Sequence, residues 1–204
     1  MMDCLIIGNG EVSKDITPKI PEDLYVICAD GGVRHLDTLG ISADLIVGDM
    51  DSLSVDVTDE NTIKYPVRKD FTDSEIAVDI AIKKEFKKIV MVGFTGTRLD
   101  HTLTNLFLLK KISKSGAMGV IIDSNNEIYY AETENEILGK IGDIVSIIPV
   151  GTDLSGITTE GLDYPLSDET LEFGKGRGVS NIMTKEKCII KIKCGQGLII
   201  KSKD

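Results

Sequence analysis

The first half of the chain alternates short apolar runs with stretches in which apolar residues recur at helical spacing. The apolar runs predict β-strands at residues 4–7, 24–28, 45–47, 62–65, 89–92 and 120–122. The helical spacing predicts helices near residues 31–39, 72–86 and 101–114. Alternating strands and helices are typical of a doubly wound, mostly parallel sheet. We therefore expect an α/β domain over residues 1–122.

From about residue 126 the helical period disappears. Short β-rich runs follow at residues 128–131, 141–150, 170–173, 180–184, 188–193 and 198–201. Glycines separate most of these runs, as is common in antiparallel sandwiches and barrels. We therefore expect an antiparallel β-sandwich over residues 123–204, with the domain boundary between residues 116 and 126.

Composition and charge restrict the partners of the chain. Its formal net charge is −10, whereas nucleic-acid binding depends on basic patches, so we expect no nucleic-acid partner. No apolar run approaches the roughly 20 residues of a membrane helix, and the N-terminus lacks the basic region of a signal peptide. We expect no membrane partner and a cytoplasmic location. The four cysteines lack metal-site spacing, so they should be reduced thiols and not zinc ligands.

Aspartates cluster where predicted strands end or predicted helices begin. Asp49 and Asp51 directly follow a predicted strand. Asp70 and Asp73 lie at the start of one predicted helix, and Asp100 lies at the start of another. The carboxyl ends of parallel strands form the ligand-binding edge of such a sheet. Carboxylates gathered there suit Mg²⁺, which prefers oxygen ligands and completes its shell with water and phosphates. The pattern indicates a magnesium-dependent site for a phosphorylated ligand.

Each of these signals also has a purely structural explanation. Asp49 and Asp51 could simply cap a turn after a buried strand. Thr72 and Asp73 could simply open a helix, because residues 72–75 fit a capping box. The two roles can coexist, since a helix N-terminus also favours phosphate. Asp100 could be no more than the N-cap of the following helix.

Two glycine-rich segments match phosphate-binding loops only in part. Residues 8–10, after the first strand, echo a dinucleotide-binding fingerprint without completing it. Residues 174–178 lack the pattern of a phosphate loop and are better explained as a hairpin turn in the β-rich half. His101 either simply belongs to the start of the helix or donates a hydrogen bond to a phosphate.

Taken in order, these motifs resemble the thiamine pyrophosphokinase family. The resemblance rests on residues 28–32, 43–52, 69–73 with Glu75, 96–102 with Asn105, 161–166 and 178–181. It covers nearly the whole chain, and the joint order and spacing of the motifs make it specific. Gly96-Thr97 stands where many family members carry two glycines.

The resemblance implies an ATP-dependent enzyme with magnesium as its cofactor. It would move the terminal pyrophosphate of ATP to the hydroxyl of thiamine and release AMP. An α/β nucleotide-binding and catalytic domain, residues 1–122, would be followed by a β-sandwich, residues 123–204, that binds thiamine and forms the dimer. Thiamine would bind between the subunits of a homodimer.

The resemblance also implies roles for individual residues. The catalytic residues would be Asp49, Asp51, Asp70, Asp73 and Asp100, and the magnesium ligands among them Asp49, Asp51 and Asp73. Nucleotide contacts would come from Asp30, Gly31, Ser52, Thr72, Arg98, His101 and Thr102. Ser180 and Asn181 would hydrogen-bond the thiamine pyrimidine.

Lys69, Arg98 and Arg34 are candidates for phosphate contact. Either Asp70 or Asp100 would accept the alcohol proton. The chain has no Trp, so Tyr164 or Phe173 would stack on thiamine if any aromatic residue does.

Two other functions stay open at this point. The first is a pyrophosphokinase for a pterin alcohol, whose nucleotide half would be much the same. The segment at Ser180 and Asn181 favours thiamine over the pterin. The second is a nucleotide-binding regulator without catalytic activity. The complete acid clusters argue against it, because a silent relative would be free to lose them.

Overall fold

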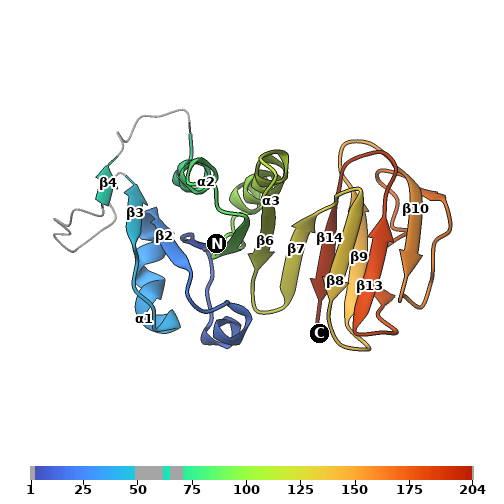
Figure 1. Ribbon diagram of the computed structural model, residues 1–204, viewed down its shortest axis with the longest axis horizontal. Coiled ribbons are helices and arrows are strands. Elements are labelled where there is room, and N and C mark those ends of the chain that lie inside the picture. The colour runs from blue at the N-terminus through green and yellow to red at the C-terminus, as the bar shows by residue number, and fades with distance from the viewer. Residues whose placement is uncertain (1–2, 49–61, 65–70, 204) are drawn as a thin grey trace. The chain divides into compact units, whose positions relative to one another are not determined.

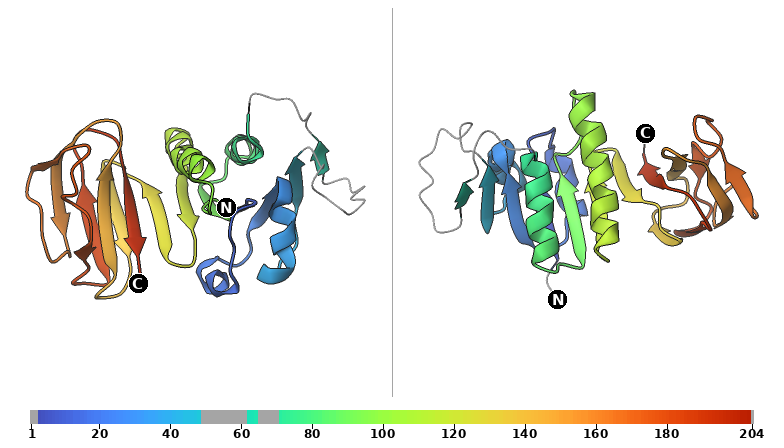
Figure 2. Two further views of the ribbon diagram at one scale, coloured as in Figure 1. Left: turned by 180° about the vertical axis from the view of Figure 1, so that it is seen from behind. Right: turned by 90° about the horizontal axis from the view of Figure 1, so that it is seen from above.

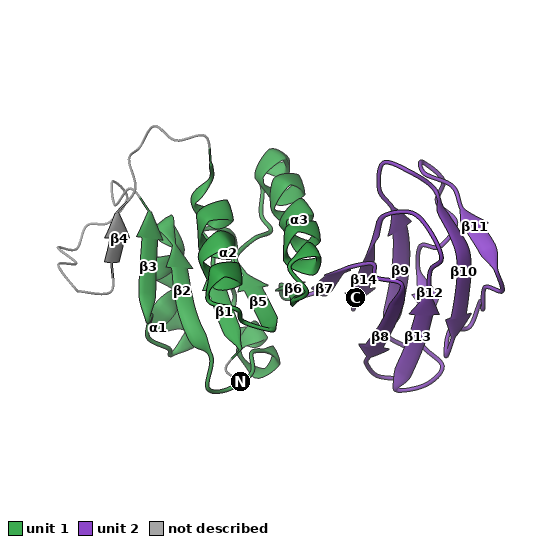
Figure 3. Ribbon diagram, turned by 45° about the horizontal axis from the view of Figure 1, so that its top comes forward, with its two compact units in different colours: residues 1–124 green, residues 125–204 purple. Residues whose placement is uncertain are grey.

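The computed structural model describes residues 3–48, 62–64 and 71–203 (Figure 1). The chain divides into two compact units, residues 1–124 and 125–204 (Figure 3). Within the described ranges, no helix is long and apolar enough to span a bilayer. The expected fold class is confirmed: an α/β unit is followed by a β-sandwich.

The first unit is built on a parallel sheet in the strand order β4-β3-β2-β1-β5-β6. Its strands are β1 (Cys4–Ile7), β2 (Tyr25–Ala29), β3 (Leu45–Gly48), β4 (Thr62–Lys64), β5 (Lys88–Val92) and β6 (Met118–Ile122). Every residue of the central strand β1 is buried. Burial on both faces explains why these strands are nearly continuous apolar runs in the sequence.

Helices cover both faces of this sheet, with α2 and α3 side by side on one face and α1 on the other (Figures 1 and 2). The helical elements are η1 (Lys14–Lys19), η2 (Asp30–His35), α1 (Leu36–Leu39), α2 (Asp73–Lys83) and α3 (Leu99–Lys114). The single helix expected at 31–39 is a 3₁₀ segment followed by one α-helical turn. Two glycines in its first half disfavour the α-helix, and Gly40 ends it with φ 69°.

The strand register brings three connecting segments to one edge of the sheet. Ile7 of β1 pairs with Cys28 of β2 and with Val92 of β5. These parallel strands therefore end at nearly the same height, and the residues that follow them leave the sheet together. This is the edge at which ligands bind in open parallel sheets.

The second unit is a sandwich of antiparallel strands. One layer has the order β12-β9-β14-β7, and the other has the order β11-β10-β13-β8. The strands are β7 (Asn126–Tyr130), β8 (Glu134–Leu138), β9 (Ile144–Pro149), β10 (Leu154–Glu160), β11 (Glu169–Leu171), β12 (Asn181–Ile182), β13 (Lys187–Lys191) and β14 (Gly197–Ser202). Buried apolar side chains from both layers form its core, among them Val145, Ile147, Ile157, Ile190 and Ile199.

The prediction of a hairpin turn at residues 174–178 is wrong. The strand before this loop, β11, pairs with β10, and the strand after it, β12, pairs with β9. The loop therefore passes from one layer of the sandwich to the other. Gly178 ends it with φ 97°, where a Cβ atom would lie 2.8 Å from the Ile147 carbonyl oxygen.

Candidate active site

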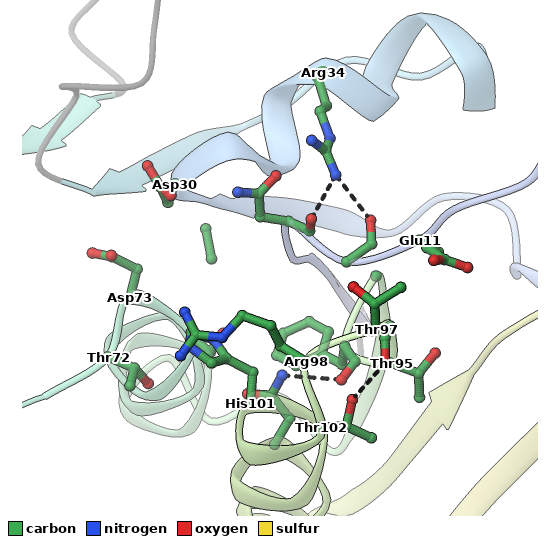
Figure 4. Close-up of a pocket in the computed structure, with 18 residues that line it drawn as sticks. Glu11, Asp30, Arg34, Thr72, Asp73, Thr95, Thr97, Arg98, His101 and Thr102 are labelled. Atoms are coloured by element: carbon green, nitrogen blue, oxygen red, sulfur yellow. Dashed lines mark hydrogen bonds between the residues drawn. The ribbon is translucent and has the colours of Figure 1, made fainter.

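A pocket of about 590 Å³ lies at the carboxyl edge of the parallel sheet (Figure 4). Its walls are the segments that follow β1, β2 and β5, together with the first turns of α2 and α3. It is lined by these residues expected from the sequence: Asp30, Thr72, Asp73, Arg98, His101 and Thr102. Figure 4 shows Asp30 and Arg34 on one side of the pocket, opposite Arg98, His101 and Thr102.

The segment after β2 is pressed against the turn after β1. A Cβ atom on Gly32 would lie 2.2 Å from the Ile7 carbonyl oxygen, and one on Gly31 would lie 2.6 Å from Asn9 Oδ1. Glycine is required at position 32, where the close atoms belong to the backbone, whereas a side chain at position 31 would displace the Asn9 side chain. Asp30, just before them, adopts φ 47°, a left-handed conformation that aspartate tolerates better than most residues.

The loop after β5 is held in place by α3. Asn105 Nδ2 donates a hydrogen bond to the Phe94 carbonyl oxygen at 3.0 Å, and Thr102 Oγ1 donates one to the Gly96 carbonyl oxygen at 3.3 Å. Thr97 lines the pocket with a backbone outside the left-handed region, so a β-branched residue is accommodated there without strain. The loop and the first turns of α3 thus form one wall.

Arg98 and Asp100 form an exposed ion pair at the start of α3. Arg98 Nη2 lies 2.5 Å from Asp100 Oδ2, and Arg98 Nε lies 3.2 Å from Oδ1. The hydrogen bond from Arg98 lowers the pKa of Asp100 and raises the pKa of Arg98. Because Arg98 is the N-cap residue and Asp100 lies inside the first turn, the N-cap explanation of Asp100 is wrong.

The expected cap of α2 is confirmed. Thr72 is the N-cap residue, and its Oγ1 accepts a hydrogen bond from the Glu75 backbone N–H at 3.2 Å. The Glu75 carboxylate lies 3.0 Å from Nζ of Lys111, which joins α2 to α3. Thr72 and Asp73 line the pocket, so the positive end of the α2 dipole faces it.

Comparison with known proteins gives the family. The family model for the thiamin pyrophosphokinase catalytic domain matches residues 19–121, and the model for the thiamin pyrophosphokinase vitamin B1 binding domain matches residues 126–199. The chain belongs to the thiamin pyrophosphokinase family. The two matches fall in different compact units of the structure.

Relatives agree with this family over most of the chain. The thiamine pyrophosphokinase of Bacillus subtilis is 28% identical, over 97% of this chain and 96% of its own. Its crystal structure superposes with a TM-score of 0.89 at 27% identity and covers 99% of each chain. Thiamin pyrophosphokinase 1 of Caenorhabditis elegans is 28% identical over 82% of this chain and 74% of its own.

Five residues that the resemblance to thiamin pyrophosphokinases assigned lie outside the described residues. They are Asp49, Asp51, Ser52, Lys69 and Asp70. Gly48, which directly precedes the first of them, lies against Asp30, because a Cβ atom on Gly48 would be 3.1 Å from Asp30 Cα. Among the described residues, no group of three or more His, Cys, Asp or Glu side chains could hold a metal ion.

In the unit matched by the vitamin B1 binding model, Asn181 holds the backbone of Tyr164. Asn181 Nδ2 donates to the Tyr164 carbonyl oxygen at 2.7 Å, and Oδ1 accepts from the Tyr164 N–H at 3.0 Å. The Tyr164 residue is 69% exposed. Ser180 has φ 59°, and its N–H donates to Ser146 Oγ at 3.0 Å. The Asn181 amide, expected to bind thiamine, is therefore hydrogen-bonded to the Tyr164 backbone.

The residues assigned from the sequence leave out part of the pocket. Asn9, Gly10 and Glu11 form its wall after β1, and Thr95 adds to the wall after β5. The only signal in the sequence was the incomplete glycine pattern at residues 8–10, which marks a tight turn after a strand.

Proposed function

We propose that this chain transfers the terminal pyrophosphate of ATP to the hydroxyl of thiamine, giving thiamine diphosphate and AMP. The observation that supports this most strongly is the pair of family matches, one to a catalytic domain and one to a vitamin B1 binding domain. Together they account for both substrates. The alternative of a pterin alcohol as acceptor gains no support from the second match.

We infer that ATP binds in the pocket of the first unit. A volume of about 590 Å³ is in the range of small-molecule sites. The N-terminus of α2 provides partial positive charge at Thr72 and Asp73, and Arg98, at the start of α3, provides a full charge. Asp100 holds the Arg98 guanidinium through both carboxylate oxygens.

We further propose that Mg²⁺ is held by Asp49, Asp51 and Asp73. Carboxylate oxygens are the donors this ion prefers, and Asp73 lines the pocket. Gly48, the last described residue before Asp49, lies against Asp30, which lines the pocket. When bound, the ion would neutralise the charge of the phosphate oxygens, which the acids alone would repel.

Asp70 is a better candidate than Asp100 for the base that accepts the proton of the thiamine hydroxyl. Both oxygens of Asp100 accept hydrogen bonds from Arg98, and this contact lowers the pKa of Asp100. A carboxylate with a lowered pKa is a weaker base. In a loose transition state the proton leaves late, so we expect the main work of the site to be positioning and charge neutralisation.

We propose a homodimer that covers an apolar stripe on α3. Leu99, Leu103 and Phe107 follow at intervals of four residues and are 71%, 52% and 50% exposed. This spacing places them on one face of the helix, and contiguous exposed apolar surface favours an interface. Leu99 directly follows Arg98, which lines the pocket. A second copy bound at Leu99 would therefore border the pocket, which supports a site shared between subunits.

We also propose a cytoplasmic location, which the free cysteines fit.

The acceptor is tested by incubating the protein with ATP, Mg²⁺ and either thiamine or a hydroxymethyl pterin. We expect AMP to form only with thiamine. AMP formation with the pterin alone would assign the chain to the alternative substrate. Tight ATP binding without any product from either alcohol would favour the non-catalytic regulator.

A further inference from the structure

The turn after β1 faces the pocket, but the backbone N–H groups of its two glycines are not available to a phosphate. The Gly8 N–H donates to the Val92 carbonyl oxygen at 2.8 Å, and the Gly10 N–H donates to the Gly93 carbonyl oxygen at 2.7 Å. A Cβ atom on Gly10 would lie 2.2 Å from the Thr95 carbonyl oxygen. The turn is therefore fixed to the loop after β5, and it does not act as a glycine-rich phosphate cradle.

The carbonyl groups of the same turn are held by two consecutive side chains of η2. Arg34 Nη2 donates to the Asn9 carbonyl oxygen at 2.6 Å and lies 3.3 Å from the Gly10 carbonyl oxygen (Figure 4). His35 Nε2 lies 2.9 Å from the same Gly10 oxygen. The Arg34 guanidinium thus reaches across from η2 and clamps the turn after β1.

The protonation of His35 is consistent with this clamp. His35 is 8% exposed, and burial lowers its pKa, so the ring is neutral at pH 7. A proton on Nε2 would be donated to the Gly10 carbonyl oxygen, whereas in the other neutral tautomer Nε2 would accept a hydrogen bond from Arg34 Nε at 3.2 Å. In either tautomer, Arg34 Nη2 keeps its bonds to the Asn9 and Gly10 carbonyl oxygens.

We propose that Arg34 is a positioning residue of the nucleotide pocket, acting through the Asn9–Gly10 turn and not through a phosphate. This inference rests on the proposed function, because it takes the pocket to be the ATP site. The charge of Arg34 is directed to two carbonyl oxygens that would otherwise repel an anionic ligand. Arg98, on the opposite wall, pairs with an exposed carboxylate and stays the candidate for phosphate contact.

Positioning of the wall and direct contact with phosphate predict different losses of affinity for nucleotides with different numbers of phosphates. A residue that shapes the wall weakens every adenine nucleotide by the same factor. A residue that contacts the phosphates weakens ATP more than AMP. For Arg34→Gln, we expect AMP and a non-hydrolysable ATP analogue to lose affinity equally, by about tenfold, because hydrogen bonds from a charged donor are removed. Arg98→Gln is the matched control, for which the loss should be larger with the ATP analogue.

Calorimetric titration with Mg²⁺ present measures both ligands on each variant. Steady-state assays should show a higher KM for ATP with kcat and the KM for thiamine nearly unchanged, which a general loss of structure would not produce. A loss confined to the ATP analogue in Arg34→Gln would overturn the inference, and so would wild-type affinity for both ligands. Binding needs no turnover, so the inference can fail while the proposed reaction stands. Absence of nucleotide binding by the unsubstituted protein would overturn both.

Discussion

Thr72 combines a structural and a functional role that substitution can separate. Its Oγ1 accepts the Glu75 N–H at 3.2 Å and caps α2, while the residue also lines the pocket. Thr72→Ala removes the cap and should lower the free energy of unfolding by about 1 kcal/mol, which corresponds to roughly 2–4 °C in melting temperature. Thr72→Ser keeps the hydroxyl and should change neither stability nor nucleotide affinity appreciably.

Thr72→Asp is the decisive variant. Aspartate is a good N-cap and interacts favourably with the helix dipole, so stability should stay within about 0.5 kcal/mol of the wild type. The added charge would lie at the proposed triphosphate site, and for an assumed separation of about 6 Å a repulsion of about 1–3 kcal/mol should weaken ATP binding roughly 5- to 150-fold. Thermal unfolding and calorimetric titration measure the two effects. Unchanged ATP affinity, or a stability loss equal to that of Thr72→Ala, would refute the reasoning.

Three further predictions concern the acids, the thiols and the buried histidine. Asp49→Asn and Asp51→Asn each remove a charged oxygen ligand and should greatly reduce turnover while changing the unfolding free energy by less than ~0.5 kcal/mol; parallel loss of activity and stability would indicate a structural role. Burial raises the pKa of Cys4 and Cys28 to about 12, whereas Cys194 is exposed, so a thiol reagent should label one cysteine per native chain and four after denaturation. Rapid labelling of two or more would contradict the burial. Burial lowers the pKa of His35, so this histidine takes up a proton in the unfolded chain before it does in the folded chain as pH falls below about 6.5. The free energy of unfolding should therefore decline below that pH. If His35→Gln showed the same dependence of unfolding free energy on pH, this reasoning would be contradicted.

The parallel sheet could be predicted from the sequence because its strands are buried on both faces. Such strands are continuous apolar runs, and the helices between them keep a clear period. The sandwich was predicted less completely. In β8 a buried Asn135 occupies an inward position, where it donates to the Ile190 carbonyl oxygen at 3.0 Å. In β10, Gly156 has φ 66° and the register with β11 shifts between Leu154 and Ile157, so the alternation is broken.

The candidate site could likewise be predicted only in part from the sequence. Asp30, Asp73 and Arg98 could be found because each stands in a compact motif, and all three line the pocket. The glycine pattern marked the Asn9–Gly10 turn, but its contact with Arg34 could not be found, because Arg34 is distant in sequence. Side-chain contacts that depend on the meeting of two segments leave no pattern in either segment alone.

The fate of the individual phosphates of ATP tests the central claim most directly. Two parallel reactions contain thiamine and Mg²⁺, one with ATP labelled at the α-phosphorus and one with ATP labelled at the γ-phosphorus, and the products are separated by chromatography. Transfer of the terminal pyrophosphate predicts that the γ label appears in thiamine diphosphate and the α label appears in an equal amount of AMP. Appearance of the γ label in thiamine monophosphate, with the α label in ADP, would contradict the account.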